Sequence, residues 1–157
     1  MIVVADASPL NYLIQIDCVW ILPKLYDRVA VPGSVIEELE RNDAPVMVRN
    51  WVASLPSWIE RVQVAFVDPD LSRLDPGERE AIQLFLDIKA NLLLIDERKG
   101  RSEAARLGIR TTGTLGVLVA ANRRRLIDAE EKYRLLISRT TFRTSKLLEQ
   151  QFLMLIQ

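Results

Sequence analysis

Two short apolar runs, each followed directly by an aspartate, constrain the fold of this chain more than any other feature. The runs are MIVVA at residues 1–5, before Asp6, and LLLI at residues 92–95 of the segment NLLLI, before Asp96. Unbroken apolar runs of this length are typical of strands that are buried on both faces of a sheet. The sequence therefore predicts that Asp6 and Asp96 lie where two buried strands end.

Further strands alternate with helices along the rest of the chain. We predict strands at residues 28–31, 59–65 and 109–113, the second at a sheet edge because its apolar and polar residues alternate. Predicted helices lie at residues 8–17, 19–26, 32–41, 45–55, 75–90, 97–108 and 114–126, and from about 128 and 144–156. This order predicts an α/β fold with a mostly parallel sheet that is covered on both faces. Right-handed crossovers bring the ends of the first and fourth strands to the same edge of the sheet.

Capping residues mark the starts of several predicted helices. Ser8 followed by Pro9 predicts an N-cap at Ser8, and Asp75 followed by Pro76 predicts another at Asp75. Thr114 is predicted to cap the helix that follows it. Because Ser8 already serves as a cap, a capping role does not account for the carboxylate of Asp6.

The composition restricts the chemistry that one domain of this length, residues 1–157, can perform. The chain has no histidine, which excludes Ser-His-Asp and Cys-His catalysis and histidine ligands to zinc. The chemistry must therefore come from carboxylates, hydroxyls, Lys or Arg, and we expect a metal that prefers oxygen ligands to take part. A single cysteine excludes an internal disulfide, and no apolar stretch approaches a membrane span, so we expect a cytoplasmic protein without membrane contact.

Four carboxylates are candidates for one site. Ligand sites of open α/β sheets form at the carboxyl ends of strands, and two aspartates there can share a divalent cation that offsets their repulsion. Helical spacing turns Glu38 toward the buried stripe of residues 32–41, whereas Glu37 faces water. The same spacing turns Glu78 toward the sheet. Glu78 is also the third helical residue after an N-cap, so a capping-box role is an alternative that does not exclude metal binding.

Five segments in this order resemble the PIN-domain nucleases. They are VVADASPL, VPGSVIEEL, LDPGEREAI, LLLIDERKGR and TTGTLGVL. The resemblance is strongest to the VapC-like bacterial and archaeal subgroup, which typically shows Asp-x-Ser-Pro-Leu near the start and Thr-Gly-Thr-Leu-Gly near the end. It covers almost the whole chain and implies a three-layer α/β/α sandwich and metal-dependent cleavage of RNA. The three consecutive arginines of NRRRLI and the apolar tail FLMLIQ depart from the subgroup without touching the acidic set.

The family's acidic positions correspond here to Asp6, Glu38, Glu78 and Asp96. On this basis Asp6 and Asp96 are expected to bind Mg²⁺ or Mn²⁺ directly. Glu38 and Glu78 are expected to hold the metal through water or to orient the attacking water. Substrate contacts are expected from hydroxyls just past strand ends and from basic residues after Asp96, namely Ser8, Thr112, Arg98, Lys99 and Arg101. For Ser8 and Thr112, turn or cap chemistry is the alternative.

The leading hypothesis is an endoribonuclease toxin of a type II toxin–antitoxin pair. The partners would be an RNA substrate, a small antitoxin and a second copy of the chain in a homodimer. The alternatives are a housekeeping PIN ribonuclease and an inactive PIN domain that binds proteins. A phosphatase with Asp6 as nucleophile is disfavoured, since Ser8 stands where such enzymes place a second aspartate. The five consecutive apolar residues 152–156 exceed the stripe of one surface helix, which favours a partner surface, with a last core helix as the alternative.

Overall fold

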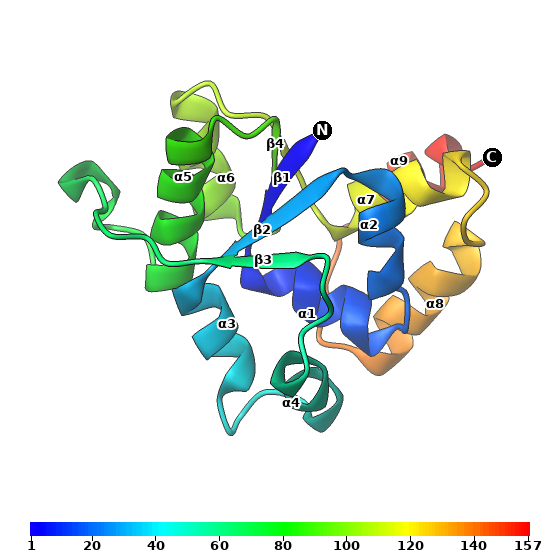
Figure 1. The fold of residues 1–157 in the computed structure, drawn as a ribbon. Coiled ribbons are helices and arrows are strands. Elements are labelled where there is room, and N and C mark those ends of the chain that lie inside the picture. The colour runs from blue at the N-terminus through cyan, green and yellow to red at the C-terminus, as the bar shows by residue number, and fades with distance from the viewer.

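A five-stranded sheet forms the centre of the molecule, and all of its strands are parallel. The computed structural model describes residues 1–157, and the strands follow the order β3-β2-β1-β4-β5 (Figure 1). The strands are β1 (Ile2–Ala5), β2 (Arg28–Pro32), β3 (Ile59–Val62), β4 (Leu92–Leu94) and β5 (Thr111–Thr112). As predicted, the first and fourth strands are neighbours, and the third lies at an edge.

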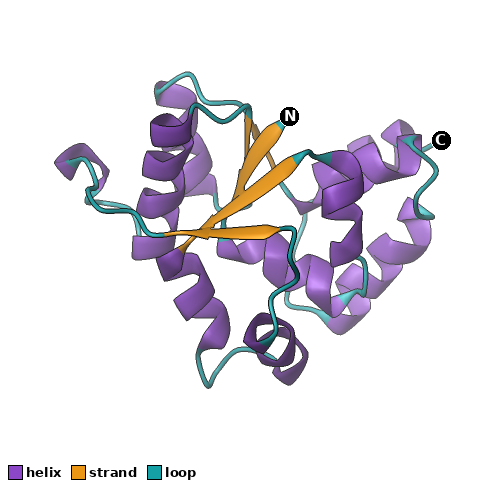
Figure 2. Cartoon of the chain, viewed as in Figure 1, coloured by secondary structure: helices purple, strands orange, loops and turns teal.

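Nine α-helices and two short 3-10 helices connect and cover the strands (Figure 2). The helices are α1 (Ala7–Gln15), α2 (Leu22–Leu25), α3 (Gly33–Glu40), α4 (Val46–Ala53), α5 (Pro76–Ile88), α6 (Arg98–Arg106), α7 (Thr114–Arg123), α8 (Ala129–Arg139) and α9 (Lys146–Leu155). The 3-10 helices η1 and η2 span Val19–Ile21 and Pro69–Leu71. None of these helices combines the length and the apolar character that a membrane span requires.

Alternate residues of the strands point into two separate cores, which makes the fold a three-layer α/β/α sandwich. Val3 and Leu94 pack into the larger core with helices α1, α2, α7 and α8, whereas Val4 and Leu93 pack into the smaller core with α5 and α6. Figure 1 shows α5 and α6 on one side of the sheet and α1, α2 and α7 on the other. Strands that bury both faces need apolar residues at every position, which explains the unbroken apolar runs.

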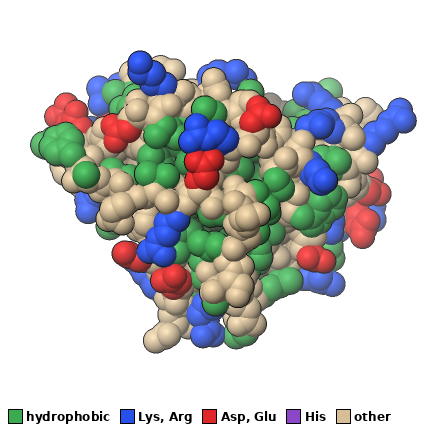
Figure 3. All heavy atoms as spheres, in the orientation of Figure 1, with side chains coloured by type: hydrophobic (Ala, Val, Ile, Leu, Met, Phe, Trp, Pro, Cys, Tyr) green, Lys and Arg blue, Asp and Glu red, His purple; other side chains and the backbone are tan.

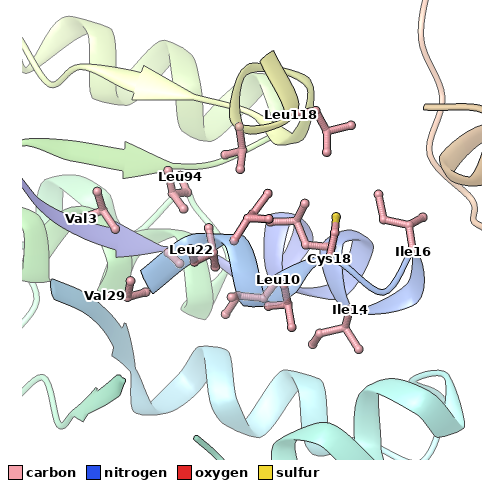
Figure 4. Close-up of a cluster of buried hydrophobic side chains, with 14 of the residues drawn as sticks. Val3, Leu10, Ile14, Ile16, Cys18, Leu22, Val29, Leu94 and Leu118 are labelled. Atoms are coloured by element: carbon pink, nitrogen blue, oxygen red, sulfur yellow. The ribbon is translucent and has the colours of Figure 1, made fainter. Parts of the chain in front are cut away.

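The larger core is built around helix α1. Its buried side chains, including Leu10 and Ile14, belong to one cluster with Val3 and Val29 of the sheet and Leu118 of α7 (Figure 4). Trp51 and Trp58 pack against this core and against each other, with ring centroids 6.0 Å apart. The strand ends at the carboxyl edge of the sheet are thereby held in a rigid setting.

Two predicted helix caps are wrong. Helix α1 begins at Ala7, so Asp6 occupies the N-cap position and Ser8 lies inside the first turn. Pro9 is compatible with this earlier start, because backbone N–H groups of the first turn have no partner in the helix. Helix α7 begins at Thr114 with Gly113 as its N-cap, and the Thr114 hydroxyl bonds elsewhere.

Candidate functional site

The carboxyl ends of β1 and β4 bring Asp6 and Asp96 to the same edge of the sheet. Ala5 pairs with Leu94 in the parallel ladder, and the backbone N–H of Asp6 donates to the carbonyl oxygen of Leu94 at 2.9 Å. Asp6 and Asp96 therefore leave neighbouring strands within two residues of this pair. Their placement matches the prediction from the apolar runs.

Asp6 is a buried carboxylate without a basic partner. Its side chain is only 4% exposed and makes no capping bond to helix α1. Burial raises the pKa of Asp6 from 3.8 to about 8, although the adjacent backbone N–H of Ala7 lowers it; the carboxylates of Asp75, Glu38 and Glu78 raise it further. No Lys or Arg offsets this burial, and a bound cation would favour the charged form of Asp6.

Asp96 is held in place by the start of helix α7. The backbone N–H and the hydroxyl of Thr114 donate to its two carboxylate oxygens, each at 2.7 Å. Burial raises the pKa of Asp96, while the two Thr114 hydrogen bonds and the charge of Arg101 oppose that rise. A Cβ at Gly113 would lie 2.6 Å from Oδ1 of Asp96, so the close approach of this carboxylate requires glycine.

Glu78 contributes a buried oxygen that has no partner. The Asp75 carboxylate accepts a hydrogen bond from the backbone N–H of Glu78 at 2.8 Å, but the Glu78 carboxylate does not return a bond as a full capping box requires. Instead, its Oε2 is buried and unpaired, and the residue is 5% exposed. Burial, followed by the charges of Asp75 and Glu97, raises the pKa of Glu78 to about 7.

Helix α3 presents Glu38 to the same edge, as its spacing predicts. Glu38 is half-buried, whereas Glu37 is exposed. Burial and then the nearby Asp75 raise the pKa of Glu38, and Arg41 lowers it. Glu38 also lowers the tendency of Asp6 to ionise, which places their charges within electrostatic range of each other.

The donor set fits a divalent cation, although no three acidic side chains converge into a metal-binding cluster as they stand. Oε2 of Glu78 is buried and has no hydrogen-bond partner. A cation, or a water molecule bound to that cation, would provide one. No positively charged side chain pairs with the buried Asp6 carboxylate, whose pKa is raised, and a cation could supply that charge. Mg²⁺ keeps several water ligands and needs only one or two carboxylates, so an open arrangement is compatible with it.

Four of the five predicted substrate residues line one pocket of about 530 Å³ beside Asp96; they are Ser8, Thr112, Arg98 and Arg101. The fifth, Lys99, does not line this pocket, and its ammonium group donates to the carbonyl oxygen of Arg73 at 2.6 Å. Lys99 also lowers the pKa of Glu78, so its charge acts on the carboxylates rather than in this pocket.

Sequence reasoning missed two contributors to the site. Asp75 was assigned only a capping role, yet its charge raises the pKa of Asp6, Glu38 and Glu78. Glu97 acts on Glu38 and Glu78 in the same direction. Asp75 lies three residues before Glu78, and Glu97 directly follows Asp96. This closeness in sequence to predicted site residues is the signal that could have identified them.

Comparison with known proteins places the chain in a family. The family model of the DUF3368 PIN domain matches residues 2–157. The chain belongs to the PIN-domain family. PIN domains are generally nucleases, a class of hydrolases, and they typically use divalent metal ions. The parallel sheet and three-layer architecture of this chain are those of a PIN domain.

Other comparisons add little to this assignment. A PilT N-terminus domain protein from the hyperthermophilic archaeon Sulfolobus solfataricus P2 is similar in structure, with 13% sequence identity and a TM-score of 0.49. The similarity covers 92% of this chain and 98% of the archaeal chain. The search of curated proteins gave no significant match.

Proposed function

We propose that this PIN domain is a metal-dependent endoribonuclease that hydrolyses phosphodiester bonds of RNA. One observation carries the proposal: Asp6 and Glu78 are buried carboxylates at the carboxyl edge of a PIN-domain sheet, burial raises the pKa of both, and Oε2 of Glu78 has no hydrogen-bond partner. Burying such groups without a counter-ion costs stability, so their retention favours a functional role for them.

The residues have separate tasks in this proposal. Asp6 and Asp96 hold Mg²⁺ or Mn²⁺ directly, and Thr114 keeps both oxygens of Asp96 in position. Glu38 and Glu78 hold the ion through water and orient the attacking water. When bound, the ion supplies positive charge to phosphate oxygens and lowers the pKa of a water. Arg98 and Arg101 attract the phosphate backbone from the adjoining pocket.

The motifs shared with VapC-like proteins support a toxin role, with a small antitoxin as inhibitor. Exposed apolar side chains on α9 offer a surface for such a partner or for a second copy of the chain; they are Leu147, Leu148, Met154 and Leu155. A short reading frame next to the gene, whose product binds the chain and blocks cleavage, is the expected finding. If the chain cleaves RNA but its gene has no such neighbouring reading frame, the toxin role is contradicted and the ribonuclease function is not.

The catalytic proposal is tested by cleavage of single-stranded RNA with Mg²⁺ or Mn²⁺, and EDTA should abolish it. Asp6→Asn keeps the shape of the side chain and removes its charge, so we expect a loss of about 10²-fold or more in kcat with the fold intact. Glu37→Gln is the matched control on exposed α3 surface and should cleave like the natural chain. Full activity of Asp6→Asn would refute the assigned role.

A further inference from the structure

The pocket beside Asp96 is closed by a segment that lies far from the acidic residues in sequence. Residues 141–144 connect α8 with α9 and form one wall, and Leu148, Phe152 and Leu155 of α9 continue it. The opposite walls come from Ser8 and Tyr12 of α1 and from the start of α6. The connector (orange in Figure 1) is anchored on α1, because the rings of Tyr12 and Phe142 meet edge-to-face with centroids 5.3 Å apart.

Three arginines from two separate segments line this pocket. Arg98 and Arg101 belong to α6 and Arg143 to the connector. None of the three takes part in an ion pair, since the five ion pairs of the chain involve other basic groups. The acidic residues of the lining are Asp96, whose oxygens are bonded to Thr114, and Glu97. The lining therefore offers unpaired guanidinium groups to an anion.

The same pocket has an apolar and hydrogen-bonding part. Leu148 and Leu155 are each 51% exposed although they line a concave surface, and Phe142 stands next to them on the connector. The hydroxyl oxygen of Thr144 is buried and has no hydrogen-bond partner. A flat heterocyclic ring would cover the exposed faces of these apolar side chains.

We infer that this pocket binds one nucleotide of single-stranded RNA next to the phosphate that is cleaved, with Arg143 on its phosphate and Phe142 against its base. The inference rests on the proposed ribonuclease function and names a subsite for its substrate. Asp96 is a wall of the pocket and a member of the carboxylate site, so a nucleotide here is adjacent to the reacting phosphodiester. The volume of about 530 Å³ lies within the usual range of roughly 300–1,000 Å³ for small-ligand sites.

The test measures RNA binding and cleavage separately. Arg143→Ala should raise KM for a single-stranded oligonucleotide about tenfold with little change in kcat, because one charge-assisted contact to substrate is lost. Arg139→Ala, an exposed arginine of α8 outside the pocket, is the matched control and should keep KM within about twofold. Phe142→Ala should weaken binding at least about fivefold. Because Phe142 also packs on the core, Arg143→Ala keeps the test valid if Phe142→Ala fails to fold.

Binding is measured in the Asp6→Asn background by anisotropy of a labelled oligonucleotide, so it does not depend on cleavage. A 4-thiouridine in the oligonucleotide should cross-link to Phe142 or Tyr12. If Arg143→Ala binds the oligonucleotide more weakly but the natural chain does not cleave RNA, the proposed ribonuclease function is refuted and the proposed nucleotide-binding pocket is supported. Normal cleavage with unchanged KM and Kd in Arg143→Ala, or cross-links confined to other surfaces, would overturn the inference and leave the ribonuclease intact. A protein partner that protects the pocket while RNA does not reach it would also overturn it.

Discussion

The two strand-end aspartates have opposite hydrogen-bond environments. Asp96 accepts two bonds from Thr114, which fix its orientation before any ligand arrives. Asp6 accepts no side-chain hydrogen bond and is held chiefly by its position after β1. In a metal site, removing a group that positions a ligand typically costs about 10–100-fold in metal affinity or activity. Thr114 is such a positioning residue for Asp96.

Replacement of Thr114 tests this role. Thr114→Val keeps the size of the side chain and removes the hydroxyl that donates to Oδ2 of Asp96. We expect about 10–100-fold weaker Mn²⁺ binding, measured by titration calorimetry, and a similar loss in cleavage at limiting metal. Thr114→Ser retains the hydroxyl and should restore binding. Equal Mn²⁺ affinity in Thr114→Val and the natural chain would contradict a positioning role.

At the scale of elements, sequence patterns predicted the parts of the site that depend on local order. Apolar runs located β1 and β4, and helical spacing separated Glu38 from Glu37. Cap positions at Ser8 and Thr114 were wrong, because the geometry of the strand-to-helix turns set the helix starts rather than local side-chain preference. Strand β3 ends at Val62 rather than at residue 65, since its continuation has no ladder partner. The contact of Phe142 with Tyr12 joins residues 130 positions apart and leaves no signal in either segment.

Helix α9 divides the apolar tail between a core face and an exposed face. Phe152 is 2% exposed and its ring centroid lies 5.0 Å from that of Tyr133 on α8. Leu153 and Ile156 are half-buried against the same core, whereas Met154 is 74% exposed. The five consecutive apolar residues therefore serve both as core and as free surface.

A pair of substitutions separates these two faces. Phe152→Ala leaves a cavity next to Tyr133, so we expect a loss of about 3–5 kcal/mol in the free energy of unfolding. Met154→Ala on the same helix should change stability by no more than about 0.5 kcal/mol. Urea denaturation followed by circular dichroism measures both. Sedimentation of Met154→Ala then reports on self-association without a loss of fold. Equal stability of the two variants would show that α9 does not contribute to the core.

At the scale of the whole molecule, the carboxylates fall into two classes whose pKa values are shifted in opposite directions. Those at the carboxyl edge of the sheet have raised pKa values, and the exposed ion-paired ones have lowered pKa values. The first class consists of Asp6, Glu38, Glu78 and Asp96, and the second of Asp27, Glu60 and Glu103. Acidic and basic side chains are interspersed over the face of the molecule that Figure 3 shows. The edge carboxylates therefore dominate the pH dependence above pH 5.

The stability of the metal-free chain should fall as the pH rises from 5 to 8. Between pH 3.8 and about 8 the folded chain keeps a proton on Asp6 that the unfolded chain has released, and Glu78 acts likewise up to about pH 7. The stability that these protons contribute is complete below the unfolded pKa values and is lost as the pH rises toward the folded ones. The free energy of unfolding and the Tm are therefore expected to be lower at pH 8 than at pH 5, since each pH unit over which one proton is retained corresponds to about 1.4 kcal/mol.

Divalent metal should reverse this loss, because it binds the deprotonated carboxylates and competes with protons. Mn²⁺ at a hundred times its Kd should add about 2.7 kcal/mol at pH 8 and much less at pH 5, as measured by thermal unfolding with and without EDTA. Asp6→Asn combined with Glu78→Gln removes two of the four titrating edge carboxylates, so its Tm should fall less with pH and respond less to Mn²⁺ than that of the natural chain. Glu37→Gln, which changes an exposed glutamate on α3, should behave like the natural chain. A metal-free Tm that stays constant or rises between pH 5 and 8 would show that burial does not raise the pKa values of Asp6 and Glu78.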